Sequence, residues 1–371
     1  MGTKNSYILL LLLLLISCNQ HTRDSQFGDN KEIVHINGIK RFDHINEFIP
    51  EEFIINKEYI KLRSTHDNFL FKEINKIRLI NDKIFILDGR LKKLLVFNKN
   101  GLSVAAIGAK GNGPNEYIDI ADFDVDKEGT IYTIDGRLDK LFIYNPDYSL
   151  KKVMALPFEA DIISVVENNK IIFGLSDWNK GNNEGASIIV TDKDLNTLNI
   201  VSYYDKYIDN AFWVSHYSFV NTSKNILYNK PINNTILVLS KKGILEKVIE
   251  FDFGRKNVPP KHRKEIEKNL NQFNSYNLLK WITIIEDDYL IGTFWENRET
   301  KSFFIDRKKN ELFVSNSTID RDIGNVAGFD NKTLIKFIIP GSERAEENDL
   351  PQDVKEHLYN GDFVLVLYRL I

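Results

Sequence analysis

The stretch "IYTIDGRLDKLFIYNPDY" (residues 131–148) repeats a stretch that lies 47 residues earlier, "IFILDGRLKKLLVFNKNG" (84–101). Both copies place a polar Asp-Gly-Arg-Leu turn between two short runs of apolar residues. Short runs rich in Ile, Val, Phe and Tyr around a turn that contains Gly are typical of a β-hairpin. The repeat therefore predicts that one hairpin-based unit recurs along the chain.

Four weaker copies of this pattern follow, at residues 171–194, 226–243, 289–310 and 333–371. Six units of about 47 residues account for the chain from residue 67 onward, once a non-strand insert near 256–273 is set aside. A period in the forties with four strands per unit is typical of a β-propeller. We therefore predict an all-β fold, a six-bladed β-propeller of four-stranded blades that occupies residues 33–371.

Two segments interrupt the strand pattern and are predicted to be short helices. The first, "VPPKHRKEIEKNLNQF" (258–273), begins with two prolines and places Ile266, Leu270 and Phe273 three or four residues apart, which is helical spacing. The second is "LPQDVKEHLYN" (350–360). We expect both inserts in loops of the top face, meaning the face with the loops that enter each innermost strand and the loops between second and third strands.

The N-terminus has the features of a secretion signal. Lys4 precedes an apolar run from Tyr7 to Ile16, which is short for a membrane span but suits a signal-peptide core. The run ends in "LISC" (15–18), which resembles the bacterial lipobox, and Cys18 is the only cysteine of the chain. We predict a lipoprotein signal peptide at 1–17, lipidation of Cys18 and a flexible tether at 18–32. Met1-Gly2 with Ser6 also fits a myristoylation pattern, but that pattern needs no apolar run behind it.

The second unit, "GNGPNEYIDIADFDVDKEGTIYTIDGRLDKLFIY" (111–144), resembles the NHL-type propeller repeat. More closely, "GNGPNEY" (111–117) behind a lipobox resembles the six-bladed propeller lipoproteins of Bacteroidetes, which carry a Gly-x-Gly-Pro-x-Glu-Tyr/Phe segment at the entry to the second blade. The resemblance implies a propeller in the cell envelope, as an outer-membrane lipoprotein that is periplasmic or surface-facing. It implies no particular chemistry.

The glycines of "IGAKGNGPNEYIDIADFDVD" (107–126) admit two interpretations. Gly-rich loops often bind phosphate, but such loops are followed by Gly-Lys-Ser/Thr and a helix. Here Pro114, Glu116 and an apolar strand pattern follow. The glycines are better suited to a tight crossing from one blade to the next.

The bulk composition excludes one class of partner. Net charge is −3 and pI is about 6.2, so the chain lacks the overall basic character of nucleic-acid-binding domains.

Catalytic motifs are absent from the sequence. The seven His residues have no metal-ligand spacing, and no Gly-x-Ser-x-Gly motif occurs. We predict no cofactor, although the many Asp and Asn residues leave a propeller-type calcium site open.

Candidate binding residues fall on the expected top-face loops, where exposed aromatic and Arg side chains commonly anchor binding surfaces. They are Trp178, Trp213, Trp295, Tyr117, Arg90, Arg137, His216 and Arg298. Each also has a structural alternative: the Arg of each Asp-Gly-Arg-Leu turn could pair with a neighbouring Asp, and Trp213 could pack between blades.

We therefore expect a monomeric, lipid-anchored propeller that catalyses nothing and binds a glycan, a peptide or a membrane protein through its top face. The alternative is a metal-dependent hydrolase or lyase, similar to propeller lactonases, with its site at the mouth of the central channel.

Overall fold

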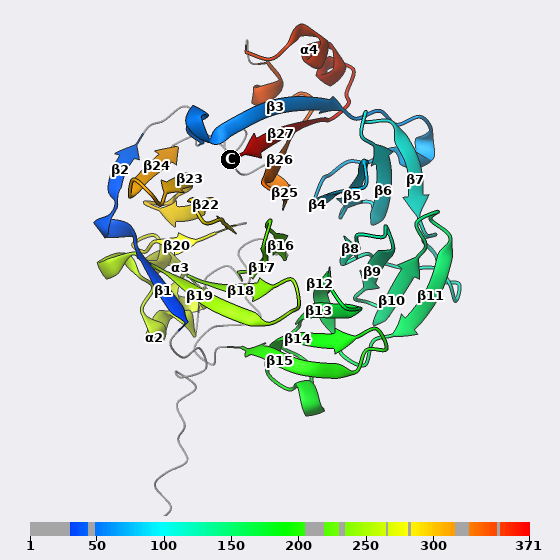
Figure 1. Ribbon diagram of the computed structural model, residues 1–371, viewed down its shortest axis with the longest axis horizontal. Coiled ribbons are helices and arrows are strands. Elements are labelled where there is room, and N and C mark those ends of the chain that lie inside the picture. Colours follow the sequence, from blue (N-terminus) through cyan, green and yellow to red (C-terminus); the bar gives the residue numbers. More distant parts are fainter. Residues whose placement is uncertain are drawn as a thin grey trace, which may run out of the picture.

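The computed structural model describes residues 30–43, 49–204, 219–229, 234–264, 266–280, 283–315, 326–346 and 349–371. Within these ranges the chain forms six mainly antiparallel sheets arranged in a closed ring, which confirms the predicted six-bladed β-propeller (Figure 1). The blades are numbered 1 to 6 from the sheet that contains β4.

From the innermost strand outward, blade 1 holds β4 (Lys76–Ile80), β5 (Lys83–Asp88), β6 (Lys93–Asn98) and β7 (Ser103–Ile107). Blade 2 holds β8 (Asp122–Val125), β9 (Ile131–Asp135), β10 (Lys140–Tyr144) and β11 (Leu150–Ala155). Blade 3 holds β12 (Ala160–Val166), β13 (Lys170–Leu175), β14 (Ala186–Asp192) and β15 (Thr197–Tyr203). Blade 4 holds β16 (Val220–Asn221), β17 (Asn225–Tyr228), β18 (Thr235–Ser240) and β19 (Leu245–Asp252). Blade 5 holds β20 (Leu278–Leu279) and β21 (Ile284–Ile285), which both pair with β22 (Tyr289–Glu296), then β23 (Glu299–Asp306) and β24 (Glu311–Ser315). Blade 6 holds β25 (Val326–Asp330), β26 (Thr333–Ile338) and β27 (Val364–Leu370).

The N-terminal strands wrap around the outside of the ring and close it. Strand β1 (Lys31–His35) pairs in parallel with β19, and β2 (Lys40–Asp43) pairs in parallel with β24. Strand β3 (Ile54–Lys61) then supplies the fourth strand of blade 6, antiparallel to β27. The first strand begins at Lys31, compared with the expected start of the propeller at residue 33. Blade 6 thus combines three strands from the C-terminal part of the described chain with one from its N-terminal part, which closes the ring without an open seam.

The core consists of apolar layers between neighbouring blades. In β5, Ile84 and Ile86 pack in the cluster shared with blade 6, whereas Phe85 and Leu87 pack in the cluster shared with blade 2. Successive side chains of a strand point to opposite faces, so a strand that is covered on both faces is apolar at every position. This explains why the repeated runs are continuously apolar rather than alternating.

The recurrent Asp-Gly-Arg-Leu turn is held by its aspartate. The carboxylate of Asp88 accepts hydrogen bonds from the backbone N–H groups of Arg90 (2.9 Å) and Leu91 (2.8 Å), and its other oxygen accepts one from Lys72 (2.7 Å) in the chain that enters blade 1. Asp135 repeats this geometry with Arg137 and Leu138 in blade 2. Both aspartates are buried, and each therefore joins a hairpin turn to the rest of the top face.

The predicted inserts are helical. Helices α2 (Pro260–Arg263) and α3 (Ile266–Phe273) lie between β19 and β20, and α4 (Gln352–Tyr359) lies between β26 and β27. The first connection enters an innermost strand and the second joins second to third strands, so both lie on the top face. Six short 3-10 segments are also present in the described chain: Ile36–Gly38, Glu51–Phe53, Asp67–Phe69, Gly181–Asn183, Gly254–Lys256 and Glu343–Glu346.

Candidate functional site

The residues predicted from the sequence to bind ligand are distributed over the top-face turns of several blades. Arg90, Arg137, Trp178 and Arg298 lie in turns between second and third strands of blades 1, 2, 3 and 5. In the described part of the chain, no hydrogen bond or ion pair joins these four side chains to one another. Trp213 and His216 lie outside the described residues.

Trp178 is the most conspicuous of them, because 70% of its surface is exposed. The next residue, Asn179, is buried and fixes the loop: its side chain bonds both the N–H (2.9 Å) and the carbonyl (2.8 Å) of Glu159, and also the carbonyl of Ser176 (3.0 Å). A hydrogen-bonded loop thus presents a large aromatic side chain to solvent, and Trp is among the residues enriched at the hot spots of binding interfaces.

Tyr117 and Trp295 have packing roles instead. Tyr117 is buried in the apolar layer between blades 1 and 2, and burial raises its pKa to about 12. Trp295 packs against the small cluster of Val258, Ile266 and Phe273 beneath α3, with Lys280 Nζ 5.1 Å from the ring centroid.

The arginine side chains of the turns are exposed, and it is their backbone N–H groups that take part in the turn. Arg137 also lies 3.6 Å from the carboxylate of Asp119, with 70% of its side chain exposed. A pair this open contributes little to stability.

The Gly-rich segment is a crossing between blades, as its sequence indicated. It connects β7 to β8, where Gly111 N–H bonds the carbonyl of Tyr117 (3.0 Å). The carboxylate of Glu116 accepts the N–H of Gly113 at 2.7 Å, and a Cβ on Gly111 would lie 2.0 Å from that carboxylate. Glu116 therefore takes the position that an anion would occupy in a phosphate-binding loop.

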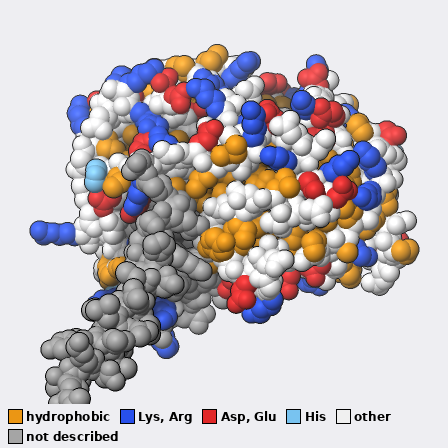
Figure 2. Space-filling view, turned by 60° about the horizontal axis from the view of Figure 1, so that its bottom comes forward, with side chains coloured by type: hydrophobic (Ala, Val, Ile, Leu, Met, Phe, Trp, Pro, Cys, Tyr) orange, Lys and Arg blue, Asp and Glu red, His pale blue; other side chains and the backbone are white. Residues whose placement is uncertain are grey.

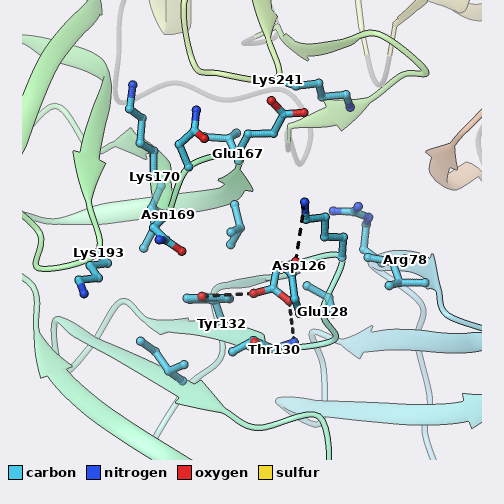
Figure 3. A pocket seen from close by; sticks show the side chains of 18 of the residues that line it. Arg78, Asp126, Glu128, Thr130, Tyr132, Glu167, Asn169, Lys170, Lys193 and Lys241 are labelled. Carbon is cyan, nitrogen blue, oxygen red and sulfur yellow. Dashed lines mark hydrogen bonds and ion pairs between the residues drawn. The ribbon is translucent and has the colours of Figure 1, made fainter.

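A large groove lies on the opposite face of the propeller, which we call the groove face. It has a volume of about 1260 Å³ and lies between blades 2 and 3, reaching inward to the channel (Figure 3). Its lining comes from turns between first and second strands, such as Asp126–Thr130 and Glu167–Asn169, and from the turn between β14 and β15. These connections lie on the face opposite to the predicted binding residues.

Basic side chains predominate in the groove. Seven lining residues are basic: Arg78, Lys127, Lys151, Lys152, Lys170, Lys193 and Lys241. Four are acidic: Asp126, Glu128, Glu167 and Asp194. Acidic and basic side chains are interspersed on the side of the molecule shown in Figure 2, and the net charge of the chain is −3. The groove lining is therefore positive although the chain as a whole is slightly negative.

Four of these lysines come from the two blades that flank the groove. Lys151 and Lys152 belong to β11 of blade 2, whereas Lys170 begins β13 and Lys193 follows β14 in blade 3. In the pairing of β10 with β11, Ile143 lies opposite Lys152 and Tyr144 lies opposite Leu150, so Lys151 has no partner residue on β10. A bulge of this kind redirects a side chain. Both adjacent lysines thereby line the groove. None of the four has a carboxylate within ion-pair distance in the part of the chain described.

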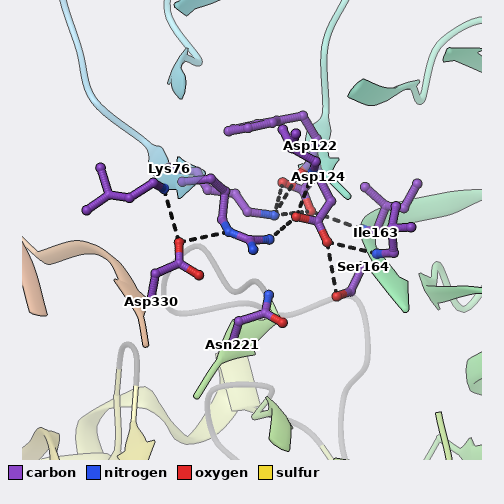
Figure 4. Close-up of polar contacts among 12 residues, drawn as sticks. Lys76, Asp122, Asp124, Ile163, Ser164, Asn221 and Asp330 are labelled. Atoms are coloured by element: carbon purple, nitrogen blue, oxygen red, sulfur yellow. Dashed lines mark hydrogen bonds and ion pairs between the residues drawn. The ribbon is translucent and has the colours of Figure 1, made fainter. Parts of the chain in front are cut away.

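The groove ends inward at a network of charged residues that joins four blades (Figure 4). Lys76 Nζ donates to both oxygens of Asp122 (2.8 and 3.0 Å) and to the carbonyl of Phe123 (2.7 Å). Asp122 in turn accepts the N–H of Ile163 at 3.0 Å. Burial lowers the pKa of Lys76, and the charge of Asp122 opposes this effect.

Arg78 forms the second half of the network. It pairs with Asp124 of blade 2, and its Nε donates to Asp330 of blade 6 at 2.9 Å. Asp124 also accepts the N–H of Val165 (2.8 Å) and the hydroxyl of Ser164 (3.2 Å) of blade 3. Arg78 is therefore held by two carboxylates, and its charge is largely neutralised.

Lys241 stands beside this network at the inner end of the groove. Its Nζ lies 3.3 Å from Asn221 Oδ1. Burial, and secondarily the charge of Arg78, lower the pKa of Lys241 to about 8. The charge of Lys241 therefore changes close to neutral pH.

The three aspartates nearest the channel, Asp122, Asp124 and Asp330, are thus paired with Lys76 and Arg78. Among the residues that the structure describes, no group of three or more His, Cys, Asp or Glu side chains is arranged to hold a metal ion. These three carboxylates join blades 2 and 6 to blade 1.

Sequence reasoning missed the groove because it weighted the long loops of the top face. The signal that could have revealed it is the recurrence of lysine in the short turns of the groove face, at Lys127, Lys193 and Lys241. Each turn is unremarkable alone, and only the ring brings these lysines together.

Comparison with known proteins agrees with this architecture. A family model described as "6-bladed beta-propeller" matches residues 24–334. No curated protein sequence matches the chain at a significant level. In the described part of the chain, no helix has the length and apolar character that a membrane crossing requires.

Three solved structures illustrate the likeness. A protein from Bacteroides fragilis that is named as exported matches with a TM-score of 0.72 and 20% identity, covering 92% of this chain and 100% of its own. A member of the DUF4221 family from Bacteroides vulgatus matches with a TM-score of 0.51 and 8% identity, over 86% and 97% of the two chains. Virginiamycin B lyase from Staphylococcus aureus has a TM-score of only 0.46 at 13% identity, over 84% and 99%. At these identities the two Bacteroides structures show the fold alone.

Proposed function

Because the chain belongs to the family of six-bladed β-propellers, we propose that it is a ligand-binding protein of the cell envelope whose groove face binds an anionic ligand without catalysis. The observation that carries this proposal is the groove of about 1260 Å³ with lysines on both walls. Lys151, Lys152, Lys170 and Lys193 have no carboxylate within ion-pair distance among the described residues. They give the groove an attractive potential for anions, since a charged cleft concentrates the field.

The envelope location is supported by the N-terminal sequence and by one structural neighbour. Cys18 follows an apolar run in a lipobox-like "LISC", and the neighbour from Bacteroides fragilis is named as exported. We propose that lipid on Cys18 anchors the protein in the outer membrane, with residues 19 to 29 as part of the tether.

The proposal is tested by titrating the mature protein with dextran sulfate, a soluble polyanion, at low and moderate salt. We expect binding that weakens as salt rises and no binding of uncharged dextran. The fourfold variant Lys151→Gln/Lys152→Gln/Lys170→Gln/Lys193→Gln should bind at least tenfold more weakly. Equal binding by this variant and the parent would reject the groove as the anion site.

A second candidate surface is the top face, which the sequence predicted and which the exposure of Trp178 favours. An aromatic side chain on a fixed loop suits a sugar ring or a protein partner. Screening the mature protein and its Trp178→Ala variant on an array of neutral glycans tests this surface separately, because the groove lysines are unchanged in both.

A further inference from the structure

The shape and chemistry of the groove indicate which anions it accepts. We infer that it binds an acidic oligosaccharide, several sugar units that carry carboxylate or sulfate groups, laid between blades 2 and 3. This inference rests on the proposed function, since it names the ligand class of the same groove.

The size of the groove favours a ligand of several units. Its volume of about 1260 Å³ exceeds the roughly 300–1,000 Å³ of pockets that hold single small molecules. Its length runs from Lys241 near the channel outward to the lysines of β11. A single sugar or a simple carboxylate would leave most of this space and most of the lysines unused.

The cations of the groove are dispersed point charges rather than a bidentate fork. Arg78 is the only arginine in the described lining, and both Asp124 and Asp330 already hold it. Phosphate recognition often uses a free Arg fork or a nest of backbone N–H groups. Lysines on flexible stems can donate hydrogen bonds to carboxylates or sulfates at several spacings, as a chain of acidic sugars would present them.

Neutral polar groups between the lysines suit sugar hydroxyls. Asn168 and Asn169 form the tip of the hairpin between β12 and β13, both with positive φ and both exposed. The partly buried Tyr132 lies on the opposite wall (Figure 3). Amide and aromatic groups between charges can contact the uncharged parts of a saccharide.

An acidic peptide fits less well. Peptide recognition uses a free sheet edge or exposed apolar pockets for alternate side chains. Several apolar residues of the lining, such as Val125, Ile143 and Ile171, are at most 9% exposed. The groove therefore offers charge and amide groups but little apolar surface to a peptide.

The test compares probes of matched length on the mature protein: a hexamer of galacturonate, its methyl-esterified neutral form and hexaglutamate. Vesicles that contain phosphatidylglycerol provide a flat anionic surface without sugar. We expect the galacturonate hexamer to bind at least tenfold more tightly than the other three probes. Titration calorimetry or fluorescence anisotropy measures the affinities.

Variants locate the binding in the groove. Lys151→Gln/Lys152→Gln and Lys170→Gln/Lys193→Gln each remove one wall and should weaken binding of the hexamer about tenfold. Lys261→Gln/Lys264→Gln in the insert of the top face changes the net charge equally and should have no effect. Melting temperatures of all three variants should match the parent, because the substituted side chains lie at the surface.

The outcomes separate the two proposals. If hexaglutamate or the vesicles bind as tightly as the hexamer and the wall variants weaken all of them, the groove binds anions but the saccharide inference is wrong. If neither the hexamer nor dextran sulfate responds to the wall variants, both proposals are wrong.

Discussion

Arg41 in the N-terminal strand β2 forms a two-pronged ion pair with Glu296 at the end of β22, with Nη1–Oε1 and Nη2–Oε2 distances of 2.9 and 2.6 Å. The two residues are 255 positions apart in the sequence. Lys301 (3.1 Å) and Asn277 (3.1 Å) also donate to the Glu296 carboxylate. The pair holds the strand that wraps around the ring against blade 5.

This relationship predicts a pH-dependent stability. Burial alone would raise the pKa of Glu296, but the hydrogen bonds from Arg41 and Lys301 outweigh it and lower the pKa to about 2. The ionised Glu296 therefore stabilises the folded state at pH values above 4.5, which is the pKa of this side chain in the unfolded chain. This stabilisation is lost as the pH falls toward about 2, the pKa of Glu296 in the folded state. Glu296→Gln should lower the free energy of unfolding at pH 7 by about 3 kcal/mol and by much less at pH 2.5, measured by urea denaturation. Glu128→Gln, in an exposed pair with Lys127, is the control and should change neither value.

The central network predicts a strong effect of removing one buried charge. Lys76→Met leaves the carboxylate of Asp122 without its cation, which should cost about 3–5 kcal/mol of unfolding free energy. The double variant Lys76→Met/Asp122→Asn should recover at least half of that loss, because no buried charge is then left unpaired. Thermal unfolding followed by circular dichroism measures both, and equal stabilities of the single and double variants would contradict an ion-pair role.

The lowered pKa of Lys241 predicts that anion binding weakens as the pH rises. Its pKa of about 8 means that its positive charge is lost as pH rises from 7 to 9, so dextran sulfate should bind more weakly at pH 9. Lys241→Arg keeps the charge at both pH values, and its affinity should be nearly constant. A parent protein whose affinity did not change over this range would show that Lys241 does not contact the anion.

The two top-face tryptophans that the structure describes should respond differently to truncation. Trp178→Ala removes a side chain that is 70% exposed and should change the unfolding free energy by less than about 0.5 kcal/mol. Trp295→Ala removes packing against the cluster beneath α3 and should cost about 1–3 kcal/mol. Differential scanning calorimetry distinguishes them, and a large effect of Trp178→Ala would assign that residue to packing.

The proposed lipid on Cys18 predicts that the protein is attached to a membrane through this residue. In a host that processes bacterial lipoproteins, the full-length protein should take up labelled palmitate and sediment with membranes. Cys18→Ser should do neither. Continued sedimentation of the variant with membranes would mean that another part of the chain provides the attachment.

The sequence predicted the architecture from local signals. The Asp-Gly-Arg-Leu turns at 88–91 and 135–138 and the four weaker copies all became the central hairpins of successive blades. These signals are local because each hairpin depends on its own turn chemistry and on runs that are apolar at every position. The wrapping of β1 and β2 around blades 4 and 5 was not predicted, because their partners lie more than two hundred residues away.

The sequence by itself thus determined the blade unit, its number of copies and the crossing role of the Gly-rich segment, where Glu116 occupies the space between the glycines. Only the tertiary structure decided which side chains meet. Lys151 and Lys193 are ordinary surface residues of two different blades until ring closure places both on one groove. The blade unit can be predicted from the sequence because hairpins form through contacts that are near in sequence. The binding surface cannot, because on a propeller it is assembled from turns of separate blades.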